Sequence, residues 1–250
     1  MNKNINLYKK IPEFNGFDWD EVKEVKIDKS KEQLISLNLI PEKIIVRSQY
    51  FIQNIKGALP ECYIRESVYD KLLEAADYLP TGFKFLVYDA WRPKSVQYEL
   101  YNRLKEEIKE ENQDLNEREL NKLVQEYVAL PSDDNKGPSP HLTGGAIDLT
   151  IIDQNGKQLD MGTAFDETDQ KTHTFYYEKM LSKKELSEVE DKILKNRRMF
   201  YNIMTEVGFV NYPHEWWHFD YGDQVWAYVS SKDKAFYSIS SPDLRWTKSF

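Results

Sequence analysis

The stretch that most constrains the fold runs from Ser139 to Asp148 and reads Ser-Pro-His-Leu-Thr-Gly-Gly-Ala-Ile-Asp. It places His141 seven residues before Asp148, with the pair Gly144-Gly145 between them. Two adjacent glycines allow a tight turn and a close approach to another part of the backbone. If the chain then enters a strand, an imidazole and a carboxylate are held close together at the start of that strand. Both groups are good zinc donors, so this stretch predicts part of a metal site.

Residues 146–152 read Ala-Ile-Asp-Leu-Thr-Ile-Ile, a pattern that predicts a strand. Alternate side chains of a strand face opposite ways, so Asp148 and Thr150 should share one side and the aliphatic side chains the other. Apolar spacing and turn residues predict further strands at 43–47, 62–64, 83–88 and within 209–222, and helices at 68–79, 93–108, 116–130 and 187–207. Helices and short strands alternate without regular βαβ spacing, which predicts an α+β fold rather than a doubly wound sheet.

Length and charge narrow the class of protein. The chain has 250 residues, of which 34 are basic and 42 acidic, giving a net charge of −8. This balance lacks the basic face of a nucleic-acid binder, so no nucleic-acid partner is expected. The first residues carry no apolar leader, and no apolar run approaches the roughly 18 residues of a membrane span, which predicts a cytoplasmic protein with no membrane partner. The single cysteine, Cys62, excludes Cys-rich zinc sites and internal disulfides.

A second stretch, Glu215-Trp-Trp-His218, adds a carboxylate and an imidazole flanked by bulky aromatic side chains. In a regular strand, residues three positions apart face opposite sides. The segment must therefore twist, bulge or turn helically if Glu215 and His218 are to face one site. The sequence alone leaves these three conformations open.

His141, Asp148 and His218 together offer three protein ligands of the kind found in catalytic zinc sites, which keep a fourth position for water. Glu215 is the candidate general base for that water. Arg92 follows a predicted buried strand and precedes a proline. It is therefore a fixed cation that could offset the negative charge developing during hydrolysis.

Each of these residues also has a structural interpretation. A lone histidine is commonly a hydrogen-bonded structural residue. Asp89 and Arg92 could form an ion pair at a strand end, and Trp216 and Trp217 could serve the core alone. Residue types and spacing leave the catalytic and structural interpretations evenly balanced. What favours a site is the combination, because two sparse motifs contain three of the four histidines in the chain.

Four motifs occur in one order along the chain: Asp89-x-x-Arg92-Pro93, Ser139-x-His141-x-x-Gly144-x-Ala146-x-Asp148, Met161-Gly-x-x-Phe-Asp166 and Glu215-x-Trp217-His218. Together they resemble the zinc peptidases that act on D-alanyl peptides, and more closely the VanX-type D-alanyl-D-alanine dipeptidases. We therefore expect a single α+β domain over residues 1–250 of the hedgehog/D-Ala-D-Ala peptidase type. A small central antiparallel sheet would carry the zinc site, with helices packed around it. Residues 1–40 would form a loosely organised N-terminal segment that packs on this domain and that the resemblance does not explain.

Carried over position by position, the resemblance implies one zinc ion per chain, held by His141, Asp148 and His218. Glu215 would deprotonate the zinc-bound water and later deliver a proton to the leaving amine. Arg92 would stabilise the tetrahedral intermediate.

The resemblance also implies roles in substrate binding. Asp166 would receive the free ammonium group of the dipeptide, and Ser139 would lie near its backbone or carboxylate. A charge-assisted contact is strong only when the partner charge is present, so N-blocked or longer substrates should be poor. The implied activity is hydrolysis of D-Ala-D-Ala to two D-alanines, either to deplete the dipeptide as in vancomycin resistance or to recycle it.

Two other functions stay open at this point. The chain could be a peptidoglycan carboxypeptidase or endopeptidase of the same superfamily, or a zinc-binding interaction module without activity. His214 lies outside the motifs; it either tunes Glu215, supports a ligand by a hydrogen bond, or faces solvent, and we favour the last. His173 lies in a polar stretch and is expected to be incidental.

Overall fold

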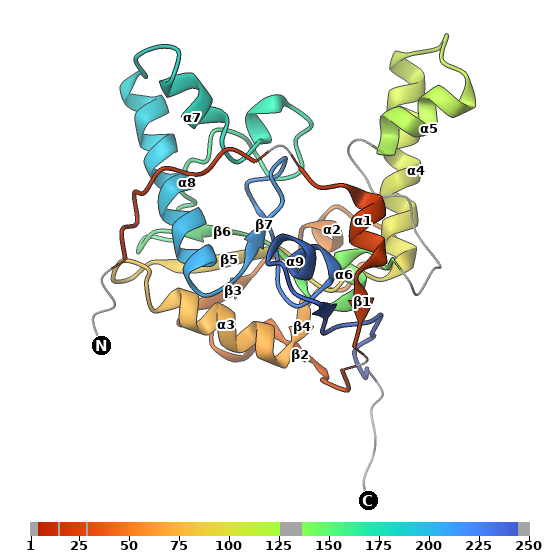
Figure 1. Ribbon diagram of the computed structural model, residues 1–250, viewed down its shortest axis with the longest axis horizontal. Coiled ribbons are helices and arrows are strands. Elements are labelled where there is room, and N and C mark those ends of the chain that lie inside the picture. Colours follow the sequence, from red (N-terminus) through yellow and green to blue (C-terminus); the bar gives the residue numbers. More distant parts are fainter. Residues whose placement is uncertain (1–4, 15, 29, 126–136, 245–250) are drawn as a thin grey trace, which may run out of the picture.

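A five-stranded sheet forms the centre of the molecule (Figure 1). The structure is a computed structural model, and it describes residues 5–14, 16–28, 30–125 and 137–244. Neighbouring strands follow the order β3-β5-β6-β8-β7. The strands of this sheet are β3 (Ile44–Val46), β5 (Lys84–Asp89), β6 (Ala146–Ile152), β8 (His218–Asp220) and β7 (Val210–Asn211).

The expected α+β fold is confirmed, and the sheet is antiparallel across β5, β6 and β8, where the predicted site lies. β3 and β5 run parallel, so the sheet as a whole is mixed. The reason is the connection between these two strands, which contains α2 (Gln49–Ile52), β4 (Tyr63–Arg65) and α3 (Glu66–Ala76). Such a long crossover returns the chain to the same end of the sheet.

One face of the sheet carries the main apolar core. The side chains that point into it, among them Phe85, Leu149 and Phe219, are fully buried. Both α3 and α8 (Glu188–Glu206) contribute side chains to this core. Phe200 of α8 lies with its ring centre 6.3 Å from that of Phe85 and 5.0 Å from that of Phe219. Burial of these rings therefore sets how α8 lies on the sheet.

The long helices begin where the sequence predicts. Ser187 caps α8 in a capping box with Glu190, each satisfying a backbone N–H of the other. Pro93 immediately precedes α4 (Lys94–Glu111), and α5 (Glu117–Gln125) packs on α4 around a small apolar cluster of its own. These two helices project from the main body in Figure 1. The rest of the helix predicted over 116–130 lies outside the described residues.

Short elements join the two ends of the chain to the body. β1 pairs in parallel with β9, and β2 pairs antiparallel with β4, so residues 26–27 and 34–36 of the N-terminal segment lie in small sheets. These and the remaining elements are α1 (Trp19–Glu24), β1 (Lys26–Ile27), β2 (Leu34–Ser36), η1 (Leu37–Leu39), α6 (Pro140–Thr143), η2 (Gln170–Thr172), α7 (Tyr176–Leu181), α9 (Gln224–Val229) and β9 (Lys234–Ala235). Across the described residues, the helices are too short or too polar to span a membrane.

Phe200→Ala should lower the free energy of unfolding by about 3–5 kcal/mol, because it removes a buried ring and leaves a cavity between α8 and the sheet. Urea unfolding followed by tryptophan fluorescence measures the change. Val189→Ala is the matched control: Val189 lies on the same helix with 63% of its surface exposed, so the effect should stay within about 0.5 kcal/mol. Equal effects of the two substitutions would contradict this packing.

Candidate metal and active site

The sheet brings two of the predicted ligands together as a cross-strand pair. Asp148 on β6 lies directly opposite His218 on β8, and Asp89 at the end of β5 is the partner of Asp148 on its other side, after a bulge. Side chains directly opposite each other share one face of a sheet. Because Leu149 and Phe219 occupy the core face, this polar row lies on the face opposite the α8 core.

His141 reaches the row from α6 (Pro140–Thr143), a single helical turn. Gly144 ends this turn with a φ of 75°, in the left-handed region that glycine adopts without strain. A Cβ at Gly145 would lie 2.7 Å from the carbonyl oxygen of Tyr221, so the close approach of the backbone just after β8 leaves no room for a side chain. The two glycines therefore let β6 begin directly beside His141, as the sequence predicted.

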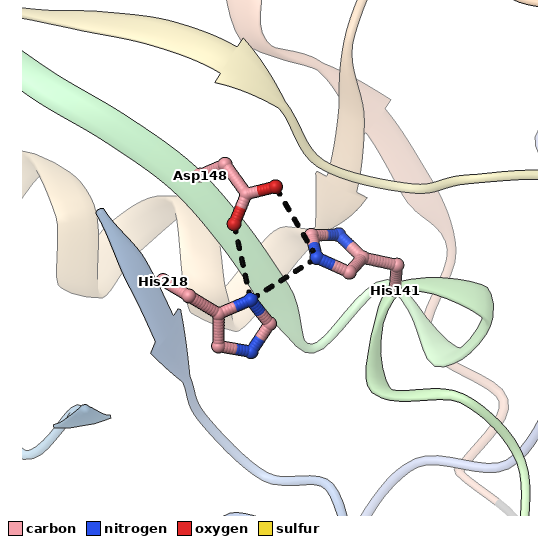
Figure 2. A group of neighbouring side chains, drawn as sticks. All are labelled: His141, Asp148 and His218. Atoms are coloured by element: carbon pink, nitrogen blue, oxygen red, sulfur yellow. Dashed lines mark hydrogen bonds and ion pairs between the residues drawn. The ribbon is translucent and has the colours of Figure 1, made fainter. Parts of the chain in front are cut away.

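Figure 2 shows the three side chains converging from α6, β6 and β8. His141 Nε2 lies 3.2 Å from His218 Nδ1 and 3.4 Å from Asp148 Oδ2. His218 Nδ1 lies 3.0 Å from Asp148 Oδ1. The three candidate ligand atoms all lie within 4.8 Å of one another. One ion with bonds of roughly 2.0–2.2 Å could contact all of them with small side-chain adjustments.

Two outer contacts indicate which nitrogen of each ring faces this centre. His141 Nδ1 lies 2.7 Å from the carbonyl oxygen of Ala90, which can only accept, so His141 Nε2 keeps its lone pair. His218 Nε2 lies 2.9 Å from Asp220 Oδ1, which leaves His218 Nδ1 for a metal. Metal-binding histidines usually donate their second N–H in this way. Two oriented imidazoles and a carboxylate fit a zinc ion with an open fourth position.

Asp220 and Asp223 are buried together behind His218. Burial and the neighbouring Asp220 raise the pKa of Asp223 well above its usual value. Burial disfavours a charged imidazole, but Asp220 and Asp148 outweigh it and raise the pKa of His218. A metal ion must displace that proton, so metal affinity should increase with pH.

Glu215 and His218 face one site because the segment between them turns. Glu215 N–H donates to the carbonyl of Tyr212 at 3.1 Å, and His218 N–H donates to the carbonyl of Glu215 at 3.3 Å, which makes two successive turns. Glu215 Oε2 lies 3.9 Å from His218 Nδ1, beside the candidate metal position. Burial raises the pKa of Glu215 to about 8, with Asp148 adding to the rise. A carboxyl whose pKa lies this close to neutral pH can both take up and give back a proton in that range.

Arg92 makes the ion pair expected at the strand end and also reaches the centre of the site. Its Nε donates to Asp89 Oδ2 at 2.8 Å, and its Nη2 donates to Asp148 Oδ2 at 3.2 Å. Gln97 Oε1 accepts from Nη1 at 2.9 Å, and the guanidinium lies over the ring of Tyr50, 4.8 Å from its centre. The structural and functional interpretations of Arg92 are therefore compatible.

Asp166 lies on the same side of the site as Arg92, at the end of the loop of residues 161–166. Its φ of 68° is unusual for a residue with a side chain. The Tyr50 hydroxyl lies 3.5 Å from Asp166 Oδ1 and 3.3 Å from Arg92 Nη2, so Tyr50 joins the two residues. Solvent reaches Asp166, but the surrounding protein desolvates its carboxyl and raises the pKa to about 6. Ser139 is half-buried where α6 begins, two positions before the candidate ligand.

His214 does not extend into solvent as we expected. Its half-buried ring stacks on that of Tyr212 at 5.3 Å and on that of His173 at 4.5 Å. The stack forms because residues 172–174 run along residues 213–216 and hydrogen-bond to them. His173 is therefore a packing partner of the segment that carries Glu215.

With this geometry established, comparison with known proteins identifies the family. The sequence pattern of peptidase family M15, described as D-Ala-D-Ala dipeptidase, matches residues 32–239, which is most of the chain. The chain belongs to this family. The resemblance inferred from four short motifs is thereby confirmed.

Several curated proteins are similar to this chain. The D-alanyl-D-alanine dipeptidase of Synechocystis sp. (strain ATCC 27184 / PCC 6803 / Kazusa) is 34% identical over 164 residues, 62% of this chain and 66% of that protein. The D-alanyl-D-alanine dipeptidase of Escherichia coli (strain K12) is 31% identical over 140 residues, 56% of each chain. That of Enterococcus faecium is 31% identical over 166 residues, 62% of this chain and 71% of that protein. The chain thus spans less than two thirds of the length of the first two.

Sequence reasoning missed three parts of the site in this family member: Asp220, Tyr50 and the carbonyl of Ala90. Asp220 could have been found, because it follows His218 by two positions in a strand and must share its face. Tyr50 and Ala90 had no usable signal. Tyr50 lies on the one-turn helix α2, and the role of a backbone carbonyl depends on neither residue type nor spacing.

Asp220→Ala should weaken zinc binding by about 10–100-fold, because His218 loses the acceptor that orients its ring and favours its metal-binding tautomer. Competition with a zinc chelator at pH 7.5 measures the affinity. Asp191→Ala, which removes an exposed carboxylate paired with Lys195 on α8, should leave the affinity unchanged. Equal affinities for the Asp220 variant and the unchanged protein would contradict the assigned orientation of His218.

Proposed function

We propose that this chain is a zinc-dependent dipeptidase that hydrolyses D-Ala-D-Ala to two D-alanines. The observation that carries the proposal is the arrangement of two further carboxylates around the candidate metal centre. Glu215 is 3.9 Å from a ligand atom of His218, and Asp166 is linked to Arg92 through Tyr50. The Glu215 carboxylate is placed to act as a general base, and the Asp166 carboxylate is placed to bind a free ammonium group. Membership of the family and the names of the curated relatives support this proposal.

Five side chains share the roles that hydrolysis requires. His141, Asp148 and His218 would hold the zinc ion, which when bound supplies a Lewis acid and makes water a better nucleophile. Glu215 accepts a proton at its carboxylate from the attacking water and then passes it to the nitrogen of the leaving D-alanine. Arg92 offsets the negative charge that develops on the former carbonyl oxygen.

Substrate length is selected at the two ends of the dipeptide. The Asp166 carboxylate receives the free ammonium of the first residue, and Ser139 lies near the backbone or carboxylate of the second. An N-acyl group removes the positive charge, and the Asp166 carboxylate then keeps its desolvation penalty without a partner. Blocked or longer D-alanyl peptides should therefore be poor substrates.

Purified protein with one equivalent of zinc should release D-alanine from D-Ala-D-Ala but not from N-acetyl-D-Ala-D-Ala or from a muropeptide ending in D-Ala-D-Ala. Free D-alanine is quantified by chromatography after incubation with each substrate. Release from the blocked or long substrates would instead indicate a carboxypeptidase or endopeptidase. No release from any substrate, with zinc bound, would indicate an interaction module.

The Glu215→Ala variant is the control for this experiment. It should retain one equivalent of zinc, because Glu215 is not one of the proposed ligands, while turnover falls by two orders of magnitude or more, in line with the roughly 10²–10⁴-fold contribution of a general base. Loss of zinc from this variant would show that Glu215 is a ligand and that its role as base is wrong.

The KM for D-Ala-D-Ala should rise as the pH falls below about 6. The pKa of Asp166 is raised to about 6, so its carboxyl is ionised above that pH and protonated below it, where it no longer attracts an ammonium group. The increase should approach roughly tenfold for each pH unit. Initial rates between pH 5 and 7 give KM separately from kcat, to which Glu215 also contributes. In Asp166→Asn, KM should be high and independent of pH; a wild-type KM that is flat over this range would exclude the ammonium contact.

A further inference from the structure

Arg197 is a fully buried cation on α8 whose hydrogen bonds go to carbonyl oxygens rather than to a carboxylate. It is 2% exposed, and its guanidinium lies 5.0 Å from the ring centre of Tyr177. Burial lowers its pKa to about 9, so it remains charged at neutral pH. Burying a charge is costly unless its donors are well satisfied. The placement therefore calls for a structural or functional reason.

The three donors of Arg197 join two loops. Nε donates to the carbonyl of Met161 at 2.8 Å, which is the start of the loop of residues 161–166. Nη1 and Nη2 donate at 2.6 Å to the carbonyls of His173 and Lys171. A planar guanidinium presents these donors in a fixed fork, so the relative position of the two loops is held by one side chain.

Each of these loops meets one part of the proposed site. The loop of residues 161–166 ends in Asp166, and the hydroxyl of Thr163 in it accepts a hydrogen bond from Trp216 Nε1 at 2.8 Å. Trp216 directly follows the proposed base. Arg197 therefore holds one end of the loop whose other end carries Asp166, the carboxylate proposed to bind the ammonium group.

The second loop, residues 171–174, pairs with residues 213–216, the segment that carries Glu215. Trp216 N–H donates to the carbonyl of Thr172 at 3.0 Å, and Thr174 N–H donates to the carbonyl of Pro213 at 2.9 Å. The hydroxyl of Thr172 also donates to the carbonyl of His214 at 2.8 Å. These bonds flank Glu215 on both sides.

We infer that Arg197 is a positioning residue that sets the separation between the base Glu215 and the ammonium-binding Asp166. This inference rests on the proposed function, because it explains how both carboxylates are placed for one dipeptide. The hydrogen bonds and ring contact of Arg197 within the described residues are with Met161, Lys171, His173 and Tyr177, none of which is a candidate metal ligand or a residue proposed to bind substrate. Its contribution is geometric: a base misplaced by about 1 Å can lower a rate by roughly 100-fold.

The test is Arg197→Lys, which keeps the positive charge but cannot donate to three carbonyls in a fixed plane. Zinc content should stay at one equivalent, while kcat/KM for D-Ala-D-Ala falls about 100-fold. KM should rise and kcat should fall, because both carboxylates move. The preference for D-Ala-D-Ala over N-acetyl-D-Ala-D-Ala should also shrink. A folded, zinc-loaded variant with unchanged kinetics and unchanged preference would overturn the inference.

Arg198→Lys is the matched control. Arg198 is the next residue on α8 and forms two hydrogen bonds of 2.7 Å with Glu178, outside both loops. This variant should keep kcat/KM within about twofold, even if its melting temperature falls. A loss of activity equal to that of the Arg197 variant would show that α8 acts only through general stability.

Hydrogen–deuterium exchange tests the same inference without activity. In Arg197→Lys the backbone N–H groups of Trp216 and Thr174 should exchange faster than in the wild type. The loop of residues 171–174 carries the Thr174 N–H and accepts from the Trp216 N–H, and in this variant Arg197 no longer holds it. Unchanged exchange would refute the bracing role. If wild-type protein cleaves no D-alanyl substrate but exchange still accelerates, the proposed function fails while the bracing holds.

Thr172→Val provides a milder variant should Arg197→Lys not fold. It removes the hydroxyl contacts with the carbonyl oxygens of His214 and Asp169. It should lower kcat while leaving KM near the wild-type value, because neither contact reaches residues 161–166. A change in KM without a change in kcat would contradict the separate roles of the two loops.

Discussion

The site depends on one cross-strand pair, Asp148 opposite His218 in the antiparallel ladder of β6 and β8. Register in such a ladder is set by the apolar side, where Ile147 lies opposite Phe219 and both are fully buried. A slip of one residue would send His218 into the core and bring Phe219 to the polar face. Burial of apolar surface against α8 therefore fixes the geometry of the polar site on the other face.

The charges around this pair are arranged so that Asp89, Asp148 and Asp220 each have a charged or hydrogen-bonding partner. Arg92 lies between Asp89 and Asp148, and Asp220 accepts from His218. Burying a carboxylate without such partners would cost several kcal/mol. The arrangement leaves two ligand nitrogens and the Asp148 oxygens directed at one point, which is where a dication would add the most favourable interaction.

The candidate metal ligands and the residues proposed for proton transfer and substrate binding lie on different kinds of structure. Asp148 and His218 are on strands, and His141 is on a helical turn closed by two glycines, so backbone hydrogen bonds set where they lie. Glu215 and Asp166 are on loops, whose positions depend on contacts with the helices around them. A rigid scaffold that carries reactive groups on braced loops is a common arrangement in enzymes. Here α8 supplies the brace through Arg197.

Local sequence patterns were sufficient for the strand at 146–152, the helix at 187–207 and the pairing of His141 with Asp148. The periodicity of apolar residues shows which face of a single helix or strand is buried. The His141–Asp148 pairing is local because only seven positions, including two glycines, separate the two residues. Tertiary structure alone decided the parallel pairing of β3, the link of Tyr50 to Asp166 over 116 positions, and the contact of Arg92 with Asp148 over 56. These depend on which buried faces of distant segments fit together, and no local pattern records that fit.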